Sequence, residues 1–75
     1  MPHDELDLKG LKCPLPVLFA RRALIHTRPG ETITVLADDP MAAVDIPHMC
    51  HREGYEVVES EKLEDVVRFV LKRPA

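Results

Sequence analysis

A chain of 75 residues, of which 45% are hydrophobic, is long enough for one domain with a single thin core. It contains no Trp, one Tyr and two Phe, so we expect that core to be mainly aliphatic. The net charge is −3 and the basic residues are scattered, which argues against direct nucleic-acid binding, because phosphate contacts need clustered Lys and Arg. No apolar stretch approaches the ~18 residues of a membrane span, and the acidic start lacks a signal-peptide pattern.

The first predicted element is a short strand over residues 5–8, where apolar and acidic residues alternate. A helix is expected from Pro14 to Thr27, because its apolar residues share one arc of a helical wheel and Pro29-Gly30 then stops it. The arc suited to a sheet contains Pro16, Val17, Ala20, Ala23 and Leu24. Alternating residues from Thr32 to Ala37 predict a second strand.

A second helix is predicted to begin at Asp38-Asp39-Pro40, with Asp39 as the N-cap and Pro40 at the first helical position. Pro47 removes a backbone hydrogen bond, so we expect this helix to be short, kinked or irregular near its middle. Gly54 is placed to end it.

The rest of the chain predicts a third strand over 55–60, a polar turn over 61–65 and a fourth strand over 66–71. The order strand, helix, strand, helix, strand, strand indicates a single α/β (α+β) domain over residues 1–75, with its core between about residues 5 and 72.

Cys13 is the candidate reactive residue, and it lies in the segment Gly10-Leu11-Lys12-Cys13-Pro14-Leu15-Pro16 between the first strand and the first helix. Proline suits the first turn of a helix, so Cys13 lies at or just before a helix N-terminus, where free N–H groups and the macrodipole favour an anion. We therefore expect the pKa of this thiol to be lowered from about 8.5 toward roughly 7. Lys12 adds a positive charge. The alternative, an inert buried cysteine, is disfavoured by the polar, proline-flanked surroundings.

The Cys-Pro-Leu-Pro sequence at 13–16 resembles the Cys-Pro-x-Pro signature of the TusA-type sulfur carrier family, also called SirA-like. Residues 6–14 resemble that family's first strand and active loop, and three later segments match its pattern in order and spacing. These segments are Pro29-Gly30-Glu31, Ala37-Asp38-Asp39-Pro40 and Asp45-Ile46-Pro47. The resemblance implies a two-layer sandwich, with two helices on one face of a four-stranded mixed sheet, like the C-terminal domain of translation initiation factor three.

The resemblance also implies a sulfur-relay protein that carries a persulfide on Cys13, with Lys12, Pro14 and Pro16 as the supporting loop. Sulfane sulfur would come from a donor such as a pyridoxal-phosphate cysteine desulfurase and pass to an acceptor protein. The pathways implied are thiouridine formation in tRNA, molybdenum cofactor supply and oxidative sulfur metabolism. Such a sulfurtransferase would act stoichiometrically, in the cytoplasm, with no cofactor beyond the covalent persulfide.

The chemistry of the loop fits this role, because a carrier must attack a donor persulfide as a thiolate and then surrender the outer sulfur. The loop has no Cys-x-x-Cys, which disfavours a dithiol cycle. Two other classes of function are retained. One is a thiol redox enzyme or sensor, and the other is a regulatory interaction module without sulfur chemistry.

Other chemistry-bearing residues have simpler explanations. Cys50 lies on the apolar arc of the second helix, where a packing role is favoured over a second reactive thiol. His48 and His51 project about 160° and 100° away from Cys50, so metal binding is a weak interpretation. Asp38 and Asp39 are interpreted as helix caps rather than paired catalytic carboxylates, and a carboxylate near a thiol would raise its pKa.

Leu15, Leu18 and Ile25 occupy the arc of the first helix opposite its core stripe. Packing against the second helix is the favoured explanation. Because Leu15 and Leu18 lie within about one turn of Cys13, a partner-binding surface is the alternative for these two.

Overall fold

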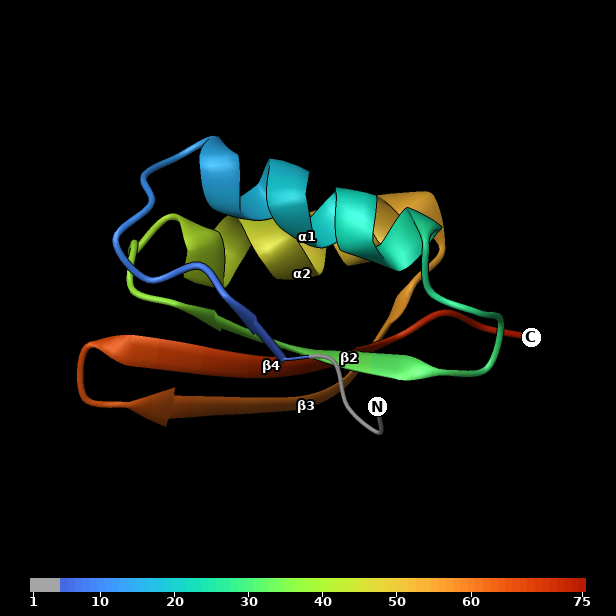
Figure 1. The fold of residues 1–75 in the computed structure, drawn as a ribbon. Coiled ribbons are helices and arrows are strands. Elements are labelled where there is room, and N and C mark those ends of the chain that lie inside the picture. Colours follow the sequence, from blue (N-terminus) through green and yellow to red (C-terminus); the bar gives the residue numbers. More distant parts are fainter. Residues whose placement is uncertain (1–4) are drawn as a thin grey trace.

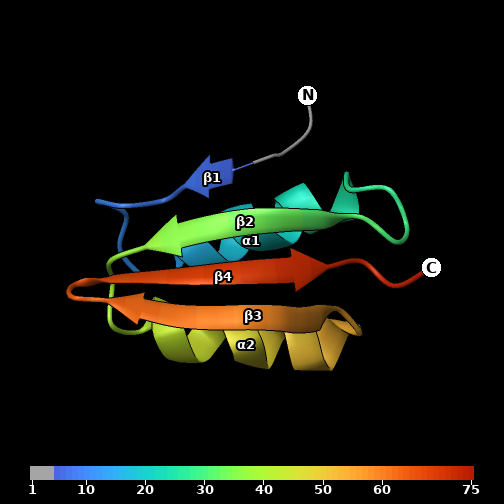
Figure 2. The same ribbon diagram turned by 90° about the horizontal axis from the view of Figure 1, so that it is seen from below.

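The computed structural model describes residues 5–75, which form a four-stranded sheet with both helices across one of its faces (Figures 1 and 2). The elements in chain order are β1 (Glu5–Asp7), α1 (Leu15–Ile25), β2 (Thr32–Ala37), α2 (Ala42–Glu53), β3 (Glu56–Leu63) and β4 (Val66–Lys72). The predicted order of elements and the two-layer arrangement are confirmed.

The directions of the strands, in the order β1-β2-β4-β3, bring three connections to the same end of the sheet. β1 and β2 are parallel, and β4 is antiparallel to both β2 and β3. The carboxyl ends of β1, β2 and β3 therefore lie at the same end of the sheet, where the β1–α1 loop, the β2–α2 loop and the β3–β4 turn meet (Figure 2). Cys13 belongs to the first of these connections.

α1 ends at Ile25, two residues before its predicted end at Thr27. A side chain from the C-terminal segment binds the carbonyl oxygens at this end of the helix. Thr27, expected inside the helix, follows it and donates its hydroxyl to the Ala23 carbonyl at 2.7 Å. Arg73 Nη1 donates to the carbonyl oxygens of Ile25 (2.9 Å) and Thr27 (2.8 Å). A cation at this end complements the helix macrodipole. The opposite end of α1 leads back to Cys13.

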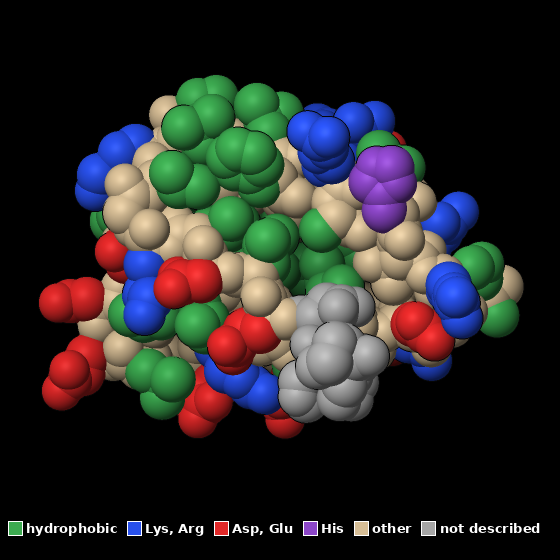
Figure 3. Space-filling view, viewed as in Figure 1, with side chains coloured by type: hydrophobic (Ala, Val, Ile, Leu, Met, Phe, Trp, Pro, Cys, Tyr) green, Lys and Arg blue, Asp and Glu red, His purple; other side chains and the backbone are tan. Residues whose placement is uncertain are grey.

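The face of α1 that points away from the sheet carries exposed apolar side chains over its N-terminal half (Figure 3). Leu15 and Leu18 are 42% and 53% exposed, and Phe19 is 41% exposed. The favoured expectation that Leu15 and Leu18 pack against the second helix is therefore wrong. The two helices lie side by side on the sheet, which leaves the outer arc of α1 uncovered.

α2 begins at Ala42, two residues after its predicted first position. Met41 precedes the helix without a side-chain cap, and Asp39 instead accepts the Met41 N–H at 3.2 Å in the turn before it. The helix runs unbroken through Pro47 to Glu53, so Pro47 does not shorten it. The carbonyl left without a partner by Pro47 belongs to Ala43, an exposed residue. Gly54, with φ of 86°, ends the helix as predicted.

The β3–β4 hairpin is tighter than predicted. β3 continues to Leu63, and the turn consists of Glu64 and Asp65, with Glu64 at φ of 56°. The charged residues before the turn belong to an edge strand, where Arg68 Nη1 lies 3.0 Å from Glu59 and 3.6 Å from Glu61. Cross-strand ion pairs of this kind let a strand be as polar as a turn. The predicted polar turn over 61–65 is therefore wrong at its first three positions.

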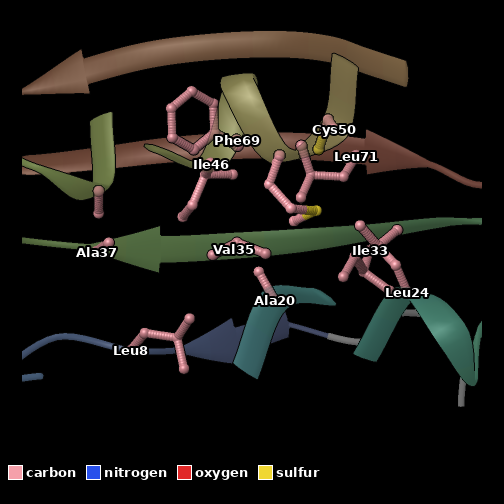
Figure 4. Close-up of a cluster of buried hydrophobic side chains, with 12 residues drawn as sticks. Leu8, Ala20, Leu24, Ile33, Val35, Ala37, Ile46, Cys50, Phe69 and Leu71 are labelled. Atoms are coloured by element: carbon pink, nitrogen blue, oxygen red, sulfur yellow. The ribbon is translucent and has the colours of Figure 1, made fainter. Parts of the chain in front are cut away.

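The core lies between the helices and the sheet and is built from aliphatic side chains around one aromatic ring (Figure 4). β2 and β4 alternate as predicted, with Val35 opposite Phe69 in the central strand pair. The buried hydrophobic residues are Leu8, Ala20, Leu24, Ile33, Val35, Ala37, Ala42, Ile46, Met49, Cys50, Phe69 and Leu71. Cys50 has no exposed surface, which confirms its predicted burial.

Candidate functional site

Cys13 is exposed on the loop between β1 and α1, at the end of the sheet where this loop meets the β2–α2 loop and the β3–β4 turn. Pro14 is the residue before α1, and Pro16 is buried in the first turn of that helix. The predicted position of Cys13, just before a helix N-terminus, is therefore correct. The Cys13–Pro14 peptide bond is cis.

Two aspartates from the β2–α2 loop hold the backbone of the Cys13 loop. Asp38 Oδ1 accepts the N–H of Gly10 at 3.0 Å, and Asp39 Oδ2 accepts the N–H of Cys13 at 2.5 Å. The Asp39 carboxylate is buried, and its other oxygen accepts the N–H of Met41. One side chain thus ties the Cys13 loop to the start of α2. The interpretation of these aspartates as helix caps missed this role.

A third aspartate contacts the sulfur itself. The Cys13 S–H donates to Oδ2 of Asp45, in the first turn of α2, across 3.6 Å. Cys13, Asp39 and Asp45 line a small recess together with Pro14, Pro16, Val17 and Ala42. The sequence offered one signal for Asp45, since Asp45-Ile46-Pro47 lies in a segment that resembles the family pattern, but its contact with Cys13 depends on how α1 and α2 pack.

The expected lowering of the Cys13 pKa is wrong. Partial desolvation raises the pKa of this thiol, and the hydrogen bond to Asp45 and the negative charges of Asp45 and Asp39 raise it further. Lys12 does not offset these carboxylates. It is exposed and forms no ion pair within residues 5–75. The surroundings of Cys13 therefore disfavour its thiolate rather than stabilise it.

The start of α1 also offers fewer free donors than the sequence suggested. The N–H of Leu15 donates to the Lys12 carbonyl at 2.9 Å, and the N–H of Leu18 donates to the Pro14 carbonyl at 3.2 Å. Pro16 has no N–H, so in this first turn the N–H of Val17 alone lacks a hydrogen bond to the described part of the chain. The macrodipole still favours an anion here, but most of the individual donors are already engaged.

A larger hollow of about 390 Å³ lies beside the Cys13 loop, between the β2–α2 loop and the β3–β4 turn. Lys12 and Lys62 line it together with Asp38, Asp39 and Asp65, and Asp39 also lines the Cys13 recess. Cys13 does not line this hollow. The sulfur of Cys13 is thus open to the surface rather than enclosed in this hollow.

Exposed apolar side chains from both helices lie near the loop. Besides Leu15, Leu18 and Phe19 on α1, Met41 is 49% exposed before α2, and Val44 is 61% exposed within it. Figure 3 shows the α1 part of this group as a continuous hydrophobic surface. Sequence reasoning found Leu15 and Leu18 but missed Met41 and Val44, because it interpreted the start of α2 only as a helix start.

The second cysteine and the histidines do not add to the site. Burial raises the pKa of Cys50 to about 11, and its thiol is free. Residues 5–75 contain no group of three or more His, Cys, Asp or Glu side chains arranged to hold a metal ion. Within the same residues, neither helix has the length and apolar character needed to cross a membrane.

The fold and the family follow from similarity to known proteins. The solved structure of a SirA-like protein from Desulfitobacterium hafniense matches with a TM-score of 0.80 and 29% identity, over 95% of this chain and 97% of that one. A protein of Archaeoglobus fulgidus named "Putative sulfur carrier protein" is 52% identical over 69 residues, which is 91% of this chain and 90% of that protein. The family model described as sulfurtransferase TusA matches residues 4–73. The chain belongs to the TusA sulfurtransferase family, as its sequence predicted.

Proposed function

We propose that this protein carries sulfane sulfur as a persulfide on Cys13 and passes it from a donor protein to an acceptor protein. Membership of the TusA family and the similarity to a sulfur carrier support a carrier role. The observation that supports Cys13 as the carrying residue is its access to solvent. Cys13 is the exposed cysteine, on a loop fixed by Asp38 and Asp39, whereas Cys50 is buried.

The proposed transfer needs no oxidant. The Cys13 thiolate attacks the outer sulfur of a donor persulfide, a new S–S bond forms to Sγ, and the S–S bond of the donor breaks. The donor cysteine leaves with the electron pair as a thiolate and takes up the proton that Cys13 lost. The outer sulfur keeps its oxidation state throughout. The reverse exchange with an acceptor thiolate unloads the carrier.

The donor we propose is a cysteine desulfurase or another protein that presents a persulfide, and the acceptor is a protein of tRNA thiolation, molybdenum cofactor supply or oxidative sulfur metabolism. The net charge of −3 favours protein partners over direct contact with nucleic acid. Two free thiols, one of them exposed, suit a reducing compartment such as the cytoplasm.

Leu15 and Leu18 are the proposed partner surface. Both side chains are about half exposed and lie in the first turn after Cys13, where a protein that exchanges sulfur with Cys13 must touch the carrier. Lys12, Pro14 and Pro16 act as the supporting loop. Pro14 and Pro16 shape the start of α1, and Lys12 presents an exposed charge beside the reactive residue.

Intact-mass analysis tests this function. The protein is incubated with a cysteine desulfurase and cysteine, and we expect a gain of one sulfur atom that a thiol reductant removes. Cys13→Ser should gain nothing, and Cys50→Ser should be loaded like the unchanged protein. Loading that survives Cys13→Ser would overturn the assignment. A mixed disulfide or a gain of oxygen at Cys13, without a gain of sulfur, would favour a redox role instead.

A further inference from the structure

We propose that Asp45 is a positioning residue that holds the resting Cys13 sulfur as a neutral thiol by accepting its S–H in a hydrogen bond. The inference rests on the proposed function only in that Cys13 is taken as the transferring residue. It is carried by the contact between the Cys13 thiol and Oδ2 of Asp45 at 3.6 Å, which is the one side-chain hydrogen bond of Cys13 within residues 5–75.

The placement of Asp45 explains why the carboxylate keeps the charge and the sulfur keeps the proton. Cys13 precedes the N-terminus of α1, and Asp45 lies in the first turn of α2. The positive ends of the two helices therefore converge on one recess, where they favour negative charge, and the carboxylates of Asp39 and Asp45 line this recess. A thiolate beside these carboxylates would add a like charge to the recess, so the neutral thiol is favoured.

Among the other charged groups around Cys13, the carboxylates act in the same direction, and Lys12 forms no ion pair with them within residues 5–75. Asp39 binds the Cys13 N–H and adds a second negative charge, while Asp38 binds Gly10, three residues away. The first turn of α1 carries no acidic residue, and its four residues are all apolar. Lys12 is exposed and stands on the side of the larger hollow. Desolvation, Asp45 and Asp39 together raise the pKa of Cys13, which agrees with this geometry.

The consequence is a carrier whose sulfur is reactive only on contact with a suitable partner. A basic side chain brought against Asp45 would neutralise the carboxylate and lower the cost of forming the thiolate. Between encounters the neutral thiol reacts slowly with stray electrophiles, because the thiolate is the nucleophile.

The test is the pH dependence of Cys13 alkylation by iodoacetamide, measured on the full chain. Asp45→Asn keeps an oxygen that can accept the S–H but removes the charge. We expect the midpoint of its pH–rate profile to fall by about half to one pH unit. The rate at pH 7 should rise about two- to fourfold, because the larger thiolate fraction is partly offset by lower intrinsic nucleophilicity. Asp45→Ala should show the same fall.

Glu31→Gln is the matched control, since it removes one exposed negative charge from the loop between α1 and β2, at the other end of α1. It should leave the midpoint unchanged. A second measurement needs no variant: high ionic strength should lower the midpoint of the unchanged protein, because salt screens the half-buried carboxylate of Asp45. An unchanged midpoint in both Asp45 variants, or an equal fall in Glu31→Gln, would overturn the proposal, as would a midpoint of the unchanged protein that salt does not lower.

These measurements separate this inference from the proposed function. If Cys13 does not carry sulfur, the unchanged protein gains no sulfur in the mass assay, whatever the alkylation profile. If Asp45 does not hold the thiol, the unchanged protein still gains sulfur, and the profiles of the Asp45 variants coincide with its own.

Discussion

The two cysteines of this protein both have a raised pKa, but the causes differ. Burial alone raises the pKa of Cys50 to about 11, inside the core beneath α2. The pKa of Cys13 is raised by partial desolvation and by the carboxylates of Asp45 and Asp39, while the residue stays exposed. A partner can alter the charges around Cys13 by contact, but only unfolding exposes Cys50. Access therefore separates the two sulfurs, since Cys13 is exposed and Cys50 is buried.

The largest expected difference is in alkylation of the native protein. Cys13 should react with iodoacetamide faster than Cys50 by a factor on the order of a thousand or more, because Cys50 becomes accessible only when α2 opens. Mass spectrometry of peptides from a timed reaction measures both rates. In denaturant the two rates should converge. Similar rates in the native protein would show that Cys50 is not protected by the core.

Asp39→Ala should be the most destabilising change near the loop. It leaves the N–H groups of Cys13 and Met41 without their acceptor in a partly buried place, which we expect to lower the free energy of unfolding by about 2–3 kcal/mol. Asp38→Ala is the matched control, since it loses only the exposed bond to Gly10 and should cost less than about 1 kcal/mol. Urea unfolding measures both. An equal loss in the two variants would contradict the bridging role of Asp39.

The sequence predicted those features that depend on neighbouring residues. The alternation from Thr32 to Ala37 and the stop at Gly54 are local, and both were located correctly. The polar end of β3 was missed because its stability comes from pairing with Arg68 on another strand. In the candidate site, the two prolines after Cys13 correctly placed it just before a helix, and they too are a local signal.

The predicted direction of the Cys13 pKa shift was wrong, because the actual direction depends on residues far away in the sequence. A helix N-terminus after Cys13 can be inferred from Pro14 and Pro16, and it favours an anion. Asp39 and Asp45, which oppose it, lie 26 and 32 residues further along the chain. Asp39 contacts Cys13 because parallel β1 and β2 bring their following loops together, and Asp45 contacts it because the two helices pack side by side on the sheet.

Serine substitution should have opposite effects at the two cysteines: one variant loses stability but still accepts sulfur, and the other keeps its stability but accepts none. Cys50→Ser places a hydroxyl in the core and should lower the free energy of unfolding by about 1–2 kcal/mol, while sulfur loading persists below the unfolding temperature. Cys13→Ser should leave thermal unfolding almost unchanged and abolish loading. Calorimetry measures the stability of both variants, and the intact-mass assay measures their sulfur loading. A stable Cys50→Ser that no longer accepts sulfur would assign chemistry to the buried thiol.

Leu18→Ala, which should have only a small effect on stability, addresses how a partner reaches Cys13. Leu18 is 53% exposed, so its truncation should change the free energy of unfolding by less than about 0.5 kcal/mol. If Leu18 belongs to the partner surface, loading from a protein donor should slow several-fold, whereas alkylation by iodoacetamide should keep its rate, because the small reagent needs no docking. Ile25→Ala is the matched control, since Ile25 is 45% exposed on the same helix but at the end far from Cys13. Equal slowing in Leu18→Ala and Ile25→Ala would place the partner contact elsewhere. Slowing in Leu18→Ala alone would show that the partner approaches over the first turns of α1, beside the sulfur that Asp45 holds.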